Sequence, residues 1–256
     1  MKLLEIELRK LIPYRSFWVA VLAYAILMPA LFISLYRFNI KIEQFTLGFN
    51  FYNFPDVWHN TTYIASWFNI LLYFFVILVV TNEYQFRTVR QNVIDGLSRW
   101  QTIVSKLLLI LLFAIGSTLI VATIALLCGL FLSEEGSGTL SFEKAEFLGF
   151  YFVQLFGYMS FALLVATLLR KQAMSIIAFL AYILVAEPVL HYRFLPEAWA
   201  PYLPLEALGS LLPNPLPAYF GMKPPAVADP SLFWLSGIYI VIFIVGSGLV
   251  LQQRDI

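Results

Sequence analysis

Few residues of this 256-residue chain could carry out chemistry. The two histidines, His59 and His191, do not form an H-E-x-x-H pair, which disfavours a zinc protease. The phosphate-binding loop G-x-x-x-x-G-K-[ST] is missing, so the chain does not itself hydrolyse nucleotides by that route. Ser247 lacks a nearby base within the apolar runs, apart from His191 at the opposite end of a helix. The sequence therefore predicts no catalytic residue, no metal site and no cofactor held by this chain.

Three polar residues within apolar runs are candidates for a pathway across a membrane. Glu187 follows a charge-free run and precedes Pro188, and an ionisable side chain inside a membrane is a candidate functional group. If the helix ends at Pro188, Glu187 lies instead at the outer interface, and this second interpretation is the one we favour. Asn69 and Tyr73 lie one helical turn apart, and hydrogen bonding between helices would explain them as well as pathway lining does.

The composition is that of a membrane protein. The chain is 61% hydrophobic and 12% charged, against about 25% charged residues in a soluble domain. Such a sequence cannot cover a surface that faces water. The net charge of +1 excludes no class of protein. Cys128 is the one cysteine and lies in an apolar run, so no disulfide framework exists.

Charge-free apolar intervals predict an all-α integral membrane protein with six transmembrane helices in a single domain, 1–256. The predicted spans are approximately 16–36, 62–82, 105–132, 147–169, 173–192 and 231–252. The interval Ala207 to Met222 is also apolar, but its three prolines indicate a surface-lying or partly inserted segment. It belongs to the stretch His191 to Ser231, which holds nine of the thirteen prolines. We expect this stretch to form short helices that re-enter the outer leaflet.

The distribution of Lys and Arg indicates the orientation, since cytoplasmic loops are richer in both residues. With both termini in the cytoplasm, eleven of the sixteen lie inside: Lys2, Arg9, Lys10, Arg15, Arg87, Arg90, Arg99, Lys106, Arg170, Lys171 and Arg254. We therefore expect a multi-pass protein of the plasma or inner membrane with both ends cytoplasmic. Residues 1–14 place leucines on one helical stripe and predict an amphipathic helix in the cytoplasmic interface.

The polar stretch from Asn82 to Lys106 separates the second and third predicted spans. It carries Arg87, Arg90 and Arg99 and is too long for a bare turn. We predict a short helix along the cytoplasmic face, on which a cytosolic partner could push. The alternative is a solvated loop that faces lipid headgroups and follows the preference of cytoplasmic loops for basic residues.

Two short motifs resemble those of a known family, both in their residues and in their positions relative to the predicted spans. The first is Glu7-Leu8-Arg9-Lys10-Leu11, and the pair Arg254-Asp255 in the C-terminal tail also fits. The second motif comprises Glu83, Phe86, Thr88, Arg90, Gly96, Ser98, Arg99 and Lys106. Together with the six predicted spans, they resemble the membrane subunit of type-2 ABC exporters. The chain departs from that pattern at Arg87, where the family often has Gly, and at Gly96, where it often has Pro.

The resemblance implies a permease subunit of an ATP-driven ABC exporter, with alternating access driven through the coupling segment 83–105. Its partners would be a cytosolic ABC ATPase subunit, which binds ATP and Mg, and a second permease chain, identical or related, within the lipid bilayer. No nucleic acid is expected. The residues expected to contact the ATPase are Arg87, Thr88, Arg90, Gln91, Asp95, Ser98 and Arg99. The resemblance also implies that the first, second and fifth spans line the transport pathway.

Two other classes of function stay open at the level of sequence. One is a membrane anchor or scaffold subunit of a secretion or motility assembly. The other is an intramembrane enzyme, which the scarcity of catalytic residues disfavours.

Overall fold

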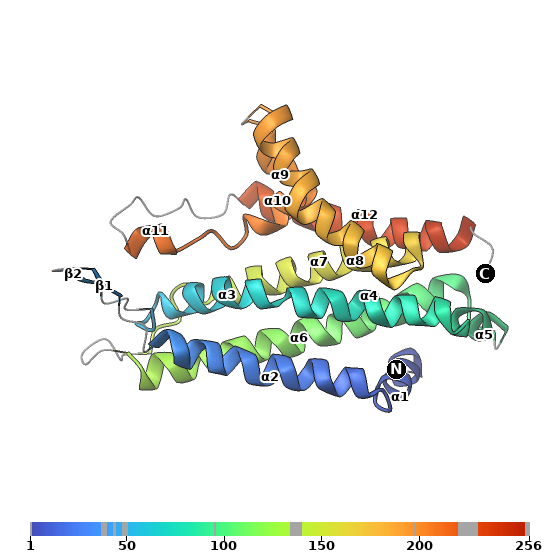
Figure 1. Cartoon of the computed structure of the whole chain (residues 1–256), viewed down its shortest axis with the longest axis horizontal. Coiled ribbons are helices and arrows are strands. Elements are labelled where there is room, and N and C mark those ends of the chain that lie inside the picture. The colour runs from blue at the N-terminus through green and yellow to red at the C-terminus, as the bar shows by residue number, and fades with distance from the viewer. Residues whose placement is uncertain are drawn as a thin grey trace.

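The computed structural model describes residues 2–36, 40–42, 45–47, 51–94, 96–133, 140–196, 198–219 and 230–253. These residues form an elongated bundle of helices (Figure 1). Among the described residues, five helices are long and apolar enough to cross a membrane, or six if one bent pair forms a single span. The architecture is compatible with the predicted all-α, multi-pass membrane protein.

Each predicted span corresponds to a helix or a set of consecutive helices. Four spans are single helices: α2 (Arg15–Tyr36), α6 (Arg99–Phe131), α7 (Glu146–Leu169) and α12 (Pro230–Gln253). The second predicted span is the pair α3 (Val57–Phe68) and α4 (Ile70–Gln85). The fifth is the series α8 (Gln172–Ala181), η1 (Tyr182–Ala186), α9 (Glu187–Val189) and η2 (Leu190–Phe194).

The remaining elements are short. They are α1 (Lys2–Leu11), β1 (Ile40–Ile42), β2 (Phe45–Leu47), α5 (Thr88–Ile94), η3 (Ala200–Tyr202), α10 (Pro204–Gly209) and α11 (Leu216–Tyr219). The strands form an antiparallel hairpin with Ile40 opposite Leu47, which the sequence did not predict. The prolines between residues 191 and 219 keep η3, α10 and α11 short. The predicted tail motif, Arg254-Asp255, lies outside the described residues.

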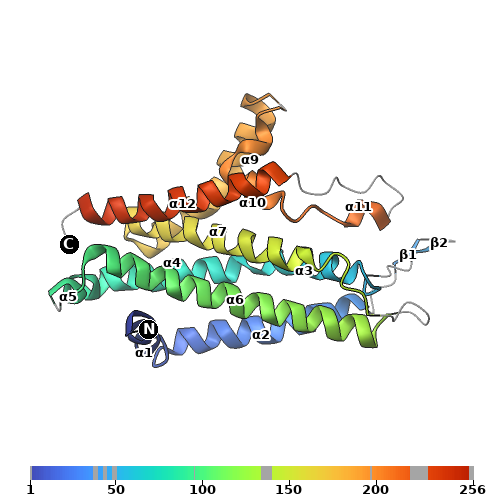
Figure 2. The same cartoon turned by 180° about the vertical axis from the view of Figure 1, so that it is seen from behind.

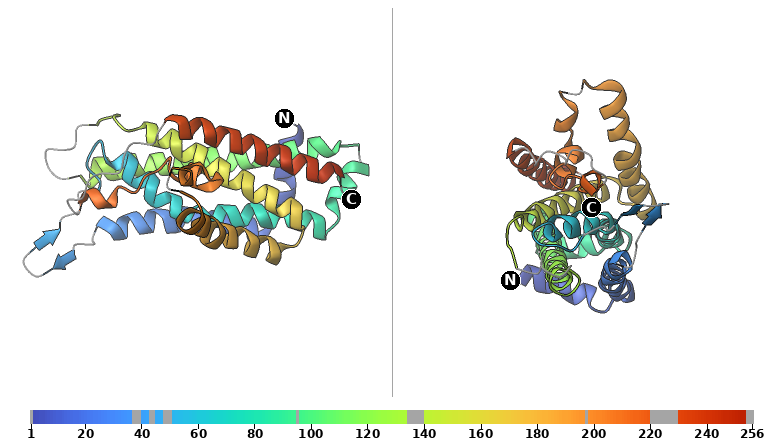
Figure 3. Two further views of the ribbon diagram at one scale, coloured as in Figure 1. Left: turned by 90° about the horizontal axis from the view of Figure 1, so that it is seen from above. Right: turned by 90° about the vertical axis from the view of Figure 1, so that its left-hand side faces the viewer.

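The two ends of the bundle differ in content (Figures 1 and 2). One end, called here the α5 end, holds α1, α5, the turn between α7 and α8, and the C-terminal end of α12. The opposite end, called the hairpin end, holds β1, β2 and α11. The part of the fifth helix series around α9 leans away from the other long helices (Figure 3).

The second predicted span is bent by 41° between α3 and α4. Asn69 separates the two helices, and its backbone N–H donates to the Ser66 carbonyl only three residues earlier, at 3.3 Å. A short polar side chain with partners on other helices competes with the regular helical pattern at such a position. The span also begins earlier than predicted, because α3 starts at Val57.

The fifth helix series does not end at Pro188, so the premise of our favoured interpretation of Glu187 is wrong. Pro188 has no backbone N–H to donate. The backbone accommodates it with wide π-type turns on either side, in one of which the Glu187 N–H donates to the Tyr182 carbonyl five residues earlier. The helix then continues to Phe194. Glu187 is therefore internal to a helix, and only 3% of it is exposed.

The central helix of the bundle is α7, which contacts α3, α4, α6, α8, α10 and α12. Small residues allow close approach of neighbouring elements, and Ala125, Gly129, Ala162 and Ala166 are all buried. Gly248 on α12 is the tightest case, because a Cβ atom there would lie 1.8 Å from the Trp100 ring of α6. This contact holds the end of α12 against the start of α6.

Candidate functional site

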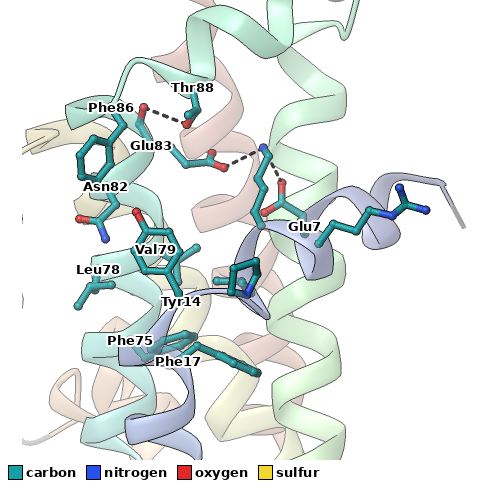
Figure 4. Close-up of a pocket in the computed structure, with 14 residues that line it drawn as sticks. Glu7, Tyr14, Phe17, Phe75, Leu78, Val79, Asn82, Glu83, Phe86 and Thr88 are labelled. Carbon is teal, nitrogen blue, oxygen red and sulfur yellow. Dashed lines mark hydrogen bonds and ion pairs between the residues drawn. The ribbon is translucent and has the colours of Figure 1, made fainter.

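Four charged side chains form a cluster at the α5 end: Glu7, Lys10, Glu83 and Lys106. Three of them are buried, and the Lys10 side chain is 32% exposed. The Lys106 Nζ atom lies 2.5 Å from Glu7 Oε2 and 2.7 Å from Glu83 Oε1. The Lys10 Nζ atom lies 3.1 Å from Glu83 Oε1 and 3.9 Å from Glu7 Oε1. The residues come from α1, α4 and α6. Figure 4 shows the carboxylates of Glu7 and Glu83 turned toward one amine, that of Lys10. We call this group the charge cluster.

The charge cluster is balanced and supplied with hydrogen bonds. Two carboxylates face two ammonium groups, and only 3% of Lys106 is exposed. Ser105 Oγ donates to Glu7 Oε1 at 2.9 Å, and Lys10 Nζ donates to Asn92 Oδ1 at 3.2 Å. Buried charges need such pairing, because an unpaired one bears the full cost of leaving water. Asn92 lies on α5, so the charge cluster also holds that helix.

The charge cluster brings together the two sequence motifs that carried the family resemblance. Glu7 and Lys106 are 99 positions apart, and Lys10 and Glu83 are 73 positions apart. Their positions in the sequence did not predict this pairing. One feature of the sequence could have predicted it: Glu83 and Lys106 each lie at the edge of a long apolar run, where a charged side chain needs a partner of opposite charge.

The helix α5 has an anchored face and an exposed face. Val89 is buried against Ile103 and Leu251, and the Thr88 hydroxyl donates to the Glu83 carbonyl at 3.3 Å. Arg90 and Gln91 are exposed, as is 68% of Ile94. The chain enters α5 through Arg87, which is exposed and has a left-handed backbone with φ 57°.

The other residues predicted to contact an ATPase lie beyond α5, and two of them bind within the chain. Ser98 caps α6: its hydroxyl accepts from the Gln101 N–H at 3.1 Å, while its own N–H donates to the Gln101 side chain. The Arg99 guanidinium donates to the carbonyls of Leu251 (3.3 Å) and Gln252 (2.6 Å), at the C-terminal end of α12. Asp95 lies outside the described residues.

Asn69 belongs to a second buried polar group, in the middle of the bundle. Its Oδ1 atom accepts from the hydroxyls of Tyr151 at 2.7 Å and Tyr24 at 3.3 Å. Ser117 Oγ lies 2.8 Å from the Tyr151 hydroxyl and 2.5 Å from that of Tyr24. We call these four residues the hydroxyl cluster. They join α2, α6 and α7 to the bend between α3 and α4.

The other two pathway candidates are also buried. Tyr73 stacks on Tyr158, with ring centroids 5.3 Å apart. The Glu187 carboxylate accepts from the backbone N–H groups of Leu205 (2.7 Å) and Glu206 (2.9 Å) at the start of α10. Helix N-termini have unpaired N–H groups that such a side chain satisfies. Glu187 therefore has a clear structural role in joining α9 to α10.

A pocket of 310 Å³ opens beside the charge cluster, between α4 and the segment that joins α1 to α2. Phe17, Phe75 and Val79 form its apolar wall, and Glu7 and Glu83 lie at its polar end (Figure 4). Within the described part of the chain, no group of three or more His, Cys, Asp or Glu side chains could hold a metal ion. The side chains at this site offer ion pairing and apolar contact.

Comparison with known proteins gives a family but no function. No curated protein matches the chain. The family model described as "Protein of unknown function (DUF2705)" matches residues 17–256. This match includes Glu83 and Lys106 of the charge cluster, whereas Glu7 and Lys10 precede it. The chain belongs to the DUF2705 family.

Proposed function

We propose that this chain is the permease subunit of an ATP-driven exporter resembling type-2 ABC exporters, with separate cytosolic ATPase subunits. The observation that supports this most strongly is the charge cluster, which joins α5 to α1, to the last turn of α4 and to the N-terminal part of α6. A helix that is held in this way, yet exposes Arg90 and Ile94, is suited to receive a partner. In this proposal the α5 end faces the cytoplasm and both termini are cytoplasmic.

The charge cluster offers a route by which a push on α5 would reach the bundle. Asn92 of α5 binds Lys10, which binds Glu83 of α4, which in turn binds Lys106 of α6. Displacement of α5 would therefore shift α1, α4 and α6 together. ATP would drive the change between inward-open and outward-open states only if the ATPase bound α5 differently in the two states.

The proposal also assigns roles to the short elements. In it α1 lies in the cytoplasmic interface, with Leu11 buried and Glu5 and Arg9 paired on its exposed side. The helix α5 is the coupling helix, and η3, α10 and α11 form the re-entrant outer segment before α12. Two permease chains, identical or related, would enclose a pathway to which Asn69, Tyr73 and Glu187 are candidates to contribute.

Affinity capture of the full-length chain from its native membrane tests the proposal. We expect the wild type to retain a cytosolic ATPase, identified by mass spectrometry and by ATP hydrolysis in the eluate. The double variant Arg90→Glu with Ile94→Glu should lose it, because both side chains lie on the exposed face of α5. Arg99 is unsuitable for this test, since it binds the end of α12.

A matched control carries the same two exchanges at the same end of the bundle but away from α5. Ile12→Glu with Arg15→Glu fits, because both residues are exposed and lie at the start of the first long helix, Ile12 just before α2 and Arg15 as its first residue. This control should retain the ATPase. Capture of an assembly without any ATPase would contradict the proposal and favour the membrane anchor or scaffold.

A further inference from the structure

A second, larger hollow at the α5 end is lined by basic side chains. It measures 800 Å³ and lies between the α4–α5 junction and the turn from α7 to α8. Four cationic residues line it: Arg87, Arg90, Arg170 and Lys171. They come from two chain segments about eighty positions apart, so folding is what assembles them. We call this hollow the basic cleft.

The charge of the basic cleft is strongly one-sided. Glu83 also lines it, but its carboxylate is bound by Lys10 and Lys106 of the charge cluster. The Arg170 guanidinium lies over the Tyr84 ring at 5.1 Å from its centroid, which fixes this cation on the wall. Since four cations face a volume large enough for a ligand, the basic cleft favours a multiply charged anion.

The backbone at the edge of the basic cleft favours an anion too. Arg170 ends α7 in the left-handed region with φ 56°, and α8 starts two residues later at Gln172, which lines the cleft. The residue before α8, Lys171, gives no side-chain cap to its first N–H groups. A helix N-terminus carries partial positive charge and adds to the attraction of the four side chains.

We propose that the basic cleft binds the phosphate-bearing headgroup of an anionic membrane phospholipid. It lies where α4 and α7 end, at the level expected for headgroups if these helices cross the bilayer. The adjoining α8 exposes apolar side chains, among them 52% of Met174 and 65% of Ile177, which suit acyl chains rather than an acidic protein segment. Basic pockets between membrane helices are a known form of headgroup site. This inference goes beyond the proposed function and needs no ATPase.

The test uses the purified full-length chain in nanodiscs of phosphatidylcholine with or without phosphatidylglycerol, followed by native mass spectrometry of retained lipid. We expect the wild type to retain phosphatidylglycerol selectively. Arg87→Gln with Lys171→Gln removes two exposed cations of the basic cleft. It should weaken retention about 30-fold, since each basic residue near an anionic headgroup contributes about a factor of five.

Two variants act as controls. Arg9→Gln with Arg15→Gln removes two exposed cations at the same end but outside the basic cleft, and should retain the lipid. Arg87→Lys with Lys171→Arg keeps the charges and should also retain it. If the charge-preserving variant loses the lipid and also does not purify as a single species, positions 87 and 171 do not tolerate substitution. The loss then reports misfolding of these variants. Arg90→Gln alone, with an expected loss of about fivefold, then decides the question.

Three results would overturn the inference. The first is equal retention of phosphatidylglycerol by the wild type and the Arg87→Gln, Lys171→Gln variant. The second is that inorganic phosphate binds the wild type as well as phosphatidylglycerol does, which would make the ligand a soluble anion. The third is loss of the captured ATPase, with unchanged lipid, in the same variant, which would make the cleft a protein contact. Failure to capture any ATPase would count against the proposed function and leave the lipid result standing.

Discussion

The charge cluster and the hydroxyl cluster are both buried, both polar and both built from several helices, yet they hold the bundle in different ways. The charge cluster has four full charges whose partners are fixed by sign, so Glu7 and Glu83 can pair only with the ammonium groups of Lys10 and Lys106. The hydroxyl cluster has groups that can donate or accept, and the buried Nδ2 of Asn69 has no acceptor among the described residues. Because this N–H donor of Asn69 is unused, the hydroxyl cluster can form a second pattern of hydrogen bonds.

This difference assigns separate parts to the two regions. The charge cluster is suited to keep α1, α4, α5 and α6 in one fixed arrangement, because separating any pair exposes a charge to an apolar surrounding. The hydroxyl cluster, at the bend next to Asn69, is suited to a change of arrangement, because its bonds can be exchanged at little cost. The comparison predicts large effects of substitution at the α5 end and small ones in the middle.

The largest effect is expected from Lys106→Met. It removes the ammonium between Glu7 and Glu83 and should lower the free energy of unfolding by about 3–5 kcal/mol, the usual cost of breaking a buried ion pair on one side. Unfolding in mixed detergent micelles, followed by tryptophan fluorescence, measures this. Adding Glu7→Gln should recover part of the loss. A loss below about 1 kcal/mol would show that water reaches the charge cluster and that it is no fixed joint.

An intermediate effect is expected from Gly248→Ala. It tests whether close packing at the α5 end contributes as much to the free energy of unfolding as the ion pairs there. A Cβ atom at Gly248 would overlap the Trp100 ring, and overpacking of this kind costs about 1–3 kcal/mol. Gly237→Ala on the same helix is the control, because a Cβ there has nothing within 4 Å. The same unfolding measurement should find Gly237→Ala neutral or stabilising. Equal effects at the two glycines would contradict the prediction.

The smallest effect is expected from Tyr151→Phe in the hydroxyl cluster. The substitution removes hydroxyl contacts to Asn69, Ser117 and Tyr24, but the remaining groups can pair with one another. We expect a loss of about 0.6 kcal/mol, the average for hydrogen bonds between membrane helices. Tyr192→Phe, at an exposed position, provides the baseline. If Tyr151→Phe cost as much as Lys106→Met, the contrast between the two clusters would disappear.

The sequence predicted the long helices because charge-free intervals of span length are a local signal. Each predicted span matches helical residues, and the largest differences are the starts of the second and third spans, since α3 begins at Val57 and α6 at Arg99 rather than at 62 and 105. The partners of Glu7 and Asn69 could not be predicted in this way. They depend on which helix faces meet, and sequence spacing along one helix says nothing about its rotation relative to another. Arg99 illustrates the limit, because its bond to the Gln252 carbonyl at the end of α12 joins residues that are far apart in the sequence.

The contact between Glu187 and α10 has a mechanical consequence. One carboxylate fastens the N-terminus of a short helix to the side of a long one. That short helix is fastened again by Tyr158 of α7, which donates to the Leu205 carbonyl, and by Ser236 of α12, which donates to the Ala207 carbonyl. The helix α10 thus links three long helical elements: the fifth helix series at α9, α7 and α12. Rotation of any one of them strains the other two attachments, so the three are expected to move as a group.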